Sequence, residues 1–155
     1  MNMNLQQPNA RNIETFDDLD DAIEDAHIDV DALIPPYRDL IRDLVNAGRF
    51  DSLSESELRR ELRYQDAIPE HTAAHTAGAR ATMRRELWSF ADENRDNPVL
   101  YSLSRGLICM FSHKDDWECA QDSVIFYFLL FLRDAIGDIE PEFVNHFAKA
   151  LFGKQ

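Results

Sequence analysis

Apolar residues recur at intervals of three and four along most of the chain, which is the spacing of amphipathic helices. The first such stripe consists of Phe16, Leu19, Ile23 and Ala26. Thr15 and Asp18 stand at its start with the spacing of a capping box, in which each side chain bonds the backbone N–H of the other residue. The pattern therefore predicts a helix that begins just after Thr15 and turns its apolar side toward the core.

The next two segments show the same spacing, each with its own start signal. A second helix is expected to begin near Pro36, because proline fits the first turn of a helix, where its missing N–H has no partner to lose. A third helix is expected after Ser54, which forms a second capping box with Glu57. In that helix we expect Leu58 and Leu62 to face inward.

Four more helices are indicated in the second half of the chain. They are expected at about 69–93, from Asn97, at about 115–136 and from Pro141. The sixth is apolar all round over 124–132, which is typical of a helix at the centre of a bundle. A β-strand is the alternative for this run, but no turn residues bracket it and no partner strand is apparent. The sequence thus predicts an all-α, single-domain bundle of six to seven helices around a buried apolar helix.

Length and composition place this bundle in one compact domain. A chain of 155 residues is long enough to bury a core of its own. Residues 1–12 are polar and are expected to form a disordered tail, leaving 13–155 as the helical domain. No apolar run approaches the twenty residues of a membrane span, and no signal peptide is visible. Two cysteines in a chain of this size indicate a reducing compartment, so we expect a cytoplasmic protein that binds no membrane.

The charge of the chain is strongly negative and unevenly distributed. It carries 29 acidic and 16 basic residues, a formal net charge of −13. Residues 1–37 contain nine acids and one base, whereas 38–105 contain twelve acids and eleven bases. A field of this sign repels nucleic acid and anionic lipid. The sequence therefore predicts no direct nucleic-acid binding and favours a basic protein partner.

The acids of the first helix gather on the side opposite its apolar stripe. They are Asp17, Asp18, Asp20, Asp21, Glu24 and Asp25. Like charges three or four residues apart repel by roughly 0.2–0.5 kcal/mol a pair, and the six such pairs here cost the helix about 1–3 kcal/mol. One interpretation is a surface kept ready for a basic partner; the other is a solvated outer face. We take these six residues as the predicted partner-binding site.

Motifs for catalysis or cofactor binding are weak. His71 and His75 are four residues apart, so a helix would present both imidazoles on one side, as a zinc site requires. The metalloprotease pattern fails, because Thr72 stands where a glutamate is needed. Three further potential ligands are Cys109, His113 and Cys119. Their spacing does not bring them to the histidine pair, so no catalytic residue and no cofactor is assigned.

Three function classes follow from these observations. The first is a small acidic protein that covers a basic surface on a macromolecule, as immunity proteins, antitoxins and DNA-mimicking inhibitors do. The second is a helical metal-binding protein or enzyme that uses His71 and His75. The third is an assembly subunit in which the aromatic stripe of the last helix forms an interface; its members are Phe143, Phe147 and Phe152. The sequence favours the first class and names neither the partner nor the oligomeric state.

Overall fold

The computed structural model describes residues 12–66, 68, 77–111 and 123–153, which form seven helices and no strand. The helices are α1 (Phe16–Asp25), α2 (Val30–Asn46), α3 (Glu55–Asp66), α4 (Ala77–Glu93), α5 (Pro98–Met110), α6 (Val124–Ile136) and α7 (Glu140–Phe152). The predicted all-α bundle is therefore confirmed, and α6 is a helix rather than a strand. None of the described helices is long and apolar enough to cross a bilayer.

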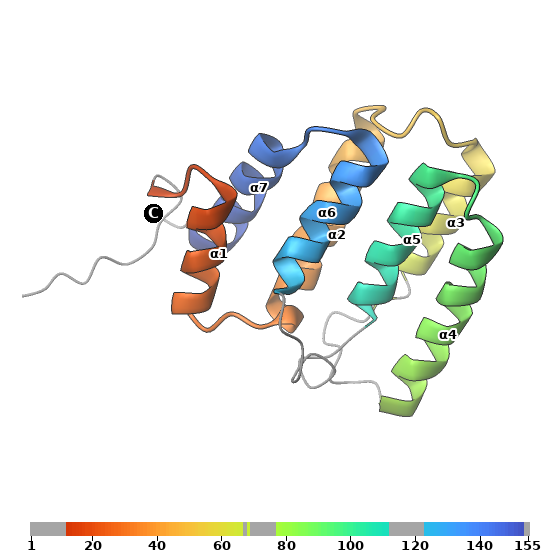
Figure 1. Cartoon of the computed structure of the whole chain (residues 1–155), viewed down its shortest axis with the longest axis horizontal. Coiled ribbons are helices and arrows are strands. Elements are labelled where there is room, and N and C mark those ends of the chain that lie inside the picture. The colour runs from red at the N-terminus through yellow and green to blue at the C-terminus, as the bar shows by residue number, and fades with distance from the viewer. Residues whose placement is uncertain (1–11, 67, 69–76, 112–122, 154–155) are drawn as a thin grey trace, which may run out of the picture.

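The helices are arranged in two layers with an added pair at one end (Figure 1). α4, α5 and α6 lie side by side in one layer, and α2 and α3 lie behind α6 and α5. The most extensive helix contacts join α5 to α4 and to α6, while α7 contacts both α1 and α2. α1 consequently lies at the edge of the molecule, at the end opposite α4.

Local hydrogen bonds at the helix starts follow the sequence closely. The Thr15 hydroxyl accepts the N–H of Asp18, and the Asp18 carboxylate accepts the N–H of Thr15, both at 3.1 Å. The Ser54 N–H donates to Glu57 at 2.8 Å, and the Glu57 N–H donates back to the Ser54 hydroxyl at 3.2 Å. The Asn97 side chain caps α5 by accepting the N–H of Leu100 at 3.2 Å. Both predicted capping boxes are thus confirmed.

The start of α2 differs from the prediction. The helix begins at Val30 and not near Pro36, with the side chain of Asp29 as its cap, so both Pro35 and Pro36 lie inside it. A proline within a helix removes a backbone hydrogen bond and costs about 3 kcal/mol or more. The additional turns bury three aliphatic side chains, namely Val30, Leu33 and Ile34. At about 1.5–3 kcal/mol for each buried aliphatic side chain, this gain offsets the cost of the prolines.

α1 and α2 end in the same backbone motif but with different residues at its key position. His27 follows α1 with φ 56°, and Gly48 follows α2 with φ 75°. In both cases the N–H of the following residue donates to the carbonyl oxygen five residues earlier. The Ile28 N–H donates to Ile23 O at 3.1 Å, and the Arg49 N–H donates to Leu44 O at 3.0 Å. This bond closes a Schellman motif, which favours glycine because a side chain crowds the left-handed backbone. α2 therefore ends without strain, and α1 does not.

The apolar α6 lies inside the bundle, as expected. Phe128 and Leu132 are fully buried, although Phe126 near its start is 37% exposed. The ring of Tyr37 from α2 stacks on Phe128, with centroids 3.9 Å apart. Gly106 of α5 lies against the same tyrosine. The predicted start of the fourth helix, before 77, lies outside the described residues. The start of the sixth differs from the prediction near 115: α6 begins at Val124, because the side chain of Ser123 caps it and Ser123 itself is extended.

Candidate functional site

The acidic residues of α1 lie on its outward side. Leu19, Ala22 and Ile23 are buried, and α1 contacts α7. The predicted set on the other side comprises Asp17, Asp18, Asp20, Asp21, Glu24 and Asp25, all exposed except Asp20, which is half-buried. The structure therefore places the six predicted site residues at the solvent-facing edge of the molecule.

None of these six carboxylates has a cationic partner in the described part of the chain, and five of them form no hydrogen bond there either. The five are Asp17, Asp20, Asp21, Glu24 and Asp25. Only some acids elsewhere have partners: Arg42 of α2 pairs with Asp66 of α3, and Arg49, in the turn after α2, pairs with Glu142 of α7. The acids of α1 thus form a surface of uncompensated negative charge, which we call the α1 acidic face and define by these five residues.

Asp18 has a different role from its neighbours. Its carboxylate accepts the N–H of Glu14 as well as that of Thr15, each at 3.1 Å. These hydrogen bonds, led by the one from Glu14, lower the pKa of Asp18. A carboxylate fixed in a helix cap is less free to meet a partner, so Asp18 is better assigned to the fold than to a binding surface.

The metal and nucleophile candidates divide between described and undescribed residues. His71, His75, His113 and Cys119 lie outside the described residues. Cys109 is buried, and burial raises the pKa of its thiol to about 12, against the opposing charge of Arg105. A thiol must lose its proton to act as a nucleophile or metal ligand. Cys109 is therefore a core residue, and the residues in view contain no cluster of three or more potential metal ligands.

The aromatic stripe of the last helix belongs to the core. Phe143 and Phe147 are fully buried and Phe152 is half-buried, so the first two cannot form a free interface. Exposed aromatic area lies instead on α4 and α6, where Trp88 is 38% and Phe126 is 37% exposed. The guanidinium of Arg105 lies 5.2 Å from the Trp88 ring centre.

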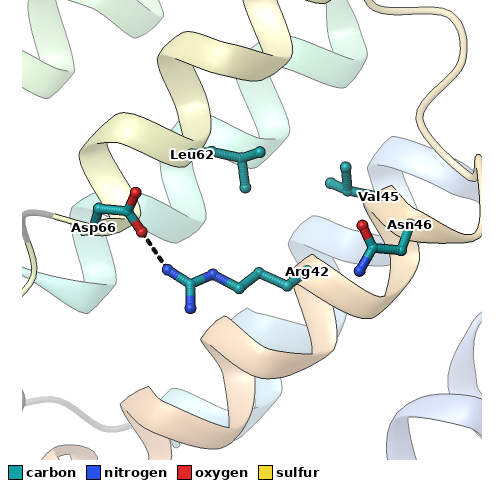
Figure 2. Close-up of a pocket in the computed structure, with 5 residues that line it drawn as sticks. All are labelled: Arg42, Val45, Asn46, Leu62 and Asp66. Carbon is teal, nitrogen blue, oxygen red and sulfur yellow. Dashed lines mark hydrogen bonds and ion pairs between the residues drawn. The ribbon is translucent and has the colours of Figure 1, made fainter.

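Two open pockets border α2. The smaller, of about 290 Å³, lies between α2 and α3 (Figure 2). Figure 2 shows the Arg42–Asp66 ion pair across one end of it, with Val45 and Leu62 between the helices. The larger, of about 600 Å³, lies between α2 and α7, next to His146, whose Nε2 is 2.8 Å from the carbonyl oxygen of Pro36. Neither pocket holds a buried charged group or a nucleophile beside a base, so neither is an evident catalytic site.

A buried polar cluster links α3 to α2 and α5, and the sequence interpretation missed it. Glu61 is 2% and Gln65 0% exposed, whereas Leu58 and Leu62, expected to face inward, are only half-buried. Burial raises the pKa of Glu61 to about 8, although a hydrogen bond from Ser104 and the charge on Arg60 oppose the shift. The residues at 58, 61, 62 and 65 share one helical stripe. Continuing the leucine spacing along the helix would have identified the two polar members.

Among the described residues, the prominent features are exposed negative charge and open grooves rather than reactive side chains. The α1 acidic face is exposed, the one described thiol is buried, and the pockets are open grooves. Comparisons with protein-family models, with curated proteins and with solved structures find no match to this chain.

Proposed function

We propose that this chain is a small acidic interaction protein whose α1 acidic face binds a basic surface on a macromolecular partner. The class includes immunity proteins, antitoxins and DNA-mimicking inhibitors, which block a surface that would otherwise contact phosphates or another polyanion. The observation that carries the proposal is the gathering of these five acids on the outer side of one helix, none of them with a cationic partner among the described residues.

The electrostatics of α1 suit recognition by long-range attraction. Two factors lower the cost of presenting several carboxylates on one helix. The first acids lie near the positive end of the helix dipole, and the side chains are in water, where repulsion is screened. A basic surface would relieve the remaining repulsion on binding. Opposite charges would also accelerate association, and added salt would weaken this effect.

The position of α1 in the fold supports the same conclusion. It lies at one end of the molecule, and its apolar side is already satisfied by the core. A partner can therefore approach its outer side without unfolding the bundle. Binding would act by covering the partner's basic surface, with Asp17, Asp20, Asp21 and Glu24 in the positions of competing phosphates.

The proposal is tested by charge reversal with a matched control. Asp17, Asp20, Asp21 and Glu24 are changed together to lysine in one variant. In the control, four exposed acids away from α1 are changed to lysine, giving the same net charge: Asp39, Asp51, Glu93 and Asp96. Partners are captured from extracts of the native host and identified by mass spectrometry, and association rates with the purified partner are then measured at low and high salt.

The α1 variant is expected to associate at least tenfold more slowly at low salt, and the control is expected to keep most of its rate. The difference should shrink at high salt, since screening removes long-range attraction. If the two variants lose the same affinity, net charge and not the α1 acidic face is responsible. If the α1 variant keeps its affinity at low salt, the proposal is wrong.

A further inference from the structure

The most deeply buried side chains of α3 are polar, while its Leu58 and Tyr64 pack partly buried against the core. Its two buried residues are Glu61 and Gln65, and its leucines, Leu58 and Leu62, are only half-buried. Helices of globular proteins are normally held by an apolar stripe. α3 therefore depends on how well its buried polar groups are satisfied.

The groups around Glu61 come from three elements. Ser104 of α5 is fully buried, with its hydroxyl 3.0 Å from Glu61 Oε1. Burial raises the pKa of the Tyr37 hydroxyl on α2, and the charges of Cys109 and Glu61 raise it further. Arg60 is the nearby cation, but its guanidinium lies 4.0 Å over the Phe90 ring of α4. Glu61 consequently forms no ion pair with a described residue.

The hydrogen bonds of Ser104 indicate the protonation state of Glu61. The Ser104 hydroxyl lies within bonding distance of two acceptors, Glu61 Oε1 and, at 2.8 Å, the carbonyl oxygen of Leu100. A hydroxyl has one hydrogen, and a carbonyl oxygen cannot donate. An ionised Glu61 therefore shares the single Ser104 hydrogen with Leu100, whereas a protonated Glu61 can itself donate to Ser104 while Ser104 donates to Leu100. The geometry thus matches a neutral carboxyl group.

Several other buried atoms of α2 and α3 have no hydrogen-bond partner among the described residues. They include Glu61 Oε2, both amide atoms of Gln65 and the hydroxyl of Tyr37. An unpaired buried polar atom costs stability, and an unpaired charged oxygen costs much more than a neutral one. α3 also contacts α4 and the start of α5 through hydrogen bonds of 3.4 Å from Tyr64 to Glu86 and from Asn97 to Glu57. Its other contacts include the Arg42–Asp66 pair and a bond from Arg38 to Ile68 O beyond its end. The first of these is exposed, and exposed ion pairs contribute little.

We infer that α3 stays docked on α2 and α5 only while Glu61 carries a proton, and that ionisation of Glu61 releases α3 from the bundle. The released helix would expose Ser104 of α5, whose hydroxyl lies against Glu61. Burial raises the pKa of Glu61 to about 8, so the docking of α3 weakens as pH rises toward that value. This pH-dependent release of α3 is independent of the α1 acidic face and requires no binding partner.

Hydrogen–deuterium exchange of the full chain between pH 6 and 9, corrected for intrinsic exchange rates, tests this inference. Peptides from α3 are compared with peptides from α6 at each pH. Protection of α3 is expected to fall by up to about tenfold for each pH unit between 6 and 8, because releasing the helix releases one proton. By pH 9 α3 should exchange freely while α6 remains protected.

Two variants distinguish Glu61 from other causes. Glu61→Gln keeps the shape and cannot ionise, so α3 should stay protected at pH 9; Glu61→Met provides the same test if the amide variant folds poorly. Glu55→Gln changes an exposed glutamate of the same helix and should leave the profile unchanged. The inference is overturned if α3 is as protected as α6 at every pH, if its protection does not change with pH, or if Glu61→Gln retains the wild-type decline.

Discussion

Substitution of Gly106 by alanine tests how tightly α2 and α5 are packed. A Cβ on residue 106 would lie 2.6 Å from the hydroxyl oxygen of Tyr37 and 3.2 Å from its Cε2. The first distance is well inside van der Waals contact. The ring has little freedom to retreat, because it is fully buried and its face is stacked on Phe128 with an interplanar angle of 7°. The methyl group and the tyrosine therefore compete for the same space.

The two opposing effects of Gly106→Ala have different sizes. Alanine is favoured over glycine inside a helix by about 1 kcal/mol. Overpacking of a rigid core costs about 1–3 kcal/mol, and a contact of 2.6 Å belongs toward the upper part of that range. We expect a net loss of about 1–2 kcal/mol in the free energy of unfolding. The clash therefore outweighs the helix propensity.

Tyr37→Phe supplies the control, because it removes the oxygen atom responsible for the shortest contact. The hydroxyl has no hydrogen-bond partner, so this change alone should be neutral or slightly stabilising. When Gly106→Ala is combined with Tyr37→Phe, the new methyl group meets only the ring carbons at 3.2 and 3.3 Å and should cost much less.

Urea denaturation of the parent, the two single variants and the double variant measures the coupling between positions 37 and 106. A favourable coupling of at least about 1 kcal/mol is expected, since the clash exists only when both the methyl group and the hydroxyl are present. Additive effects, or a Gly106→Ala variant more stable than the parent, would show that the interface is loose enough to absorb a methyl group.

Two further expectations concern stability. Folding raises the pKa of Glu61 from 4.5 to about 8, so the folded chain holds the extra proton between these values and stability falls as pH rises through them. The advantage of Glu61→Gln in urea denaturation should therefore widen by up to about 3 kcal/mol from pH 6 to 8, and a constant difference would contradict the burial argument. His27→Gly should raise stability by about 0.5–1 kcal/mol in thermal unfolding, because glycine accepts φ 56° without strain. An unchanged or lower midpoint would mean that contacts of the His27 side chain outweigh that strain.

The features predicted correctly from sequence are those whose partners are close along the chain. The capping box of Thr15 and Asp18 spans three residues, and so does that of Ser54 and Glu57. The start of α2 was mispredicted because proline signals a first turn locally. What decides the start is burial of Val30 and its neighbours against residues far away in sequence.

The same distinction applies to the candidate sites. The α1 acidic face lies on one helix, so helical spacing alone places its members on one side. The environment of Glu61 depends on Ser104, 43 residues away, and on Tyr37 from a third helix. Helical spacing from Leu58 and Leu62 places Glu61 and Gln65 on the inward stripe, but no local pattern reports that these polar members are the more deeply buried. The surface charge could be predicted because it depends on spacing within one helix. The buried carboxyl could not, because its environment depends on contacts between residues far apart in the sequence.

The edge position of α1 has a consequence for the order of folding. The extensive contacts of α5 join it to α4 and α6, its neighbours along the chain, and close only short loops. α1 instead meets α7, as in the contact between the rings of Phe16 and Phe143, whose centroids are 6.4 Å apart. The entropy of closing a loop grows with its length, so this contact gains stability only once the intervening helices have compacted the chain. The helix that carries the unpaired acids therefore docks late, onto a nucleus assembled without it.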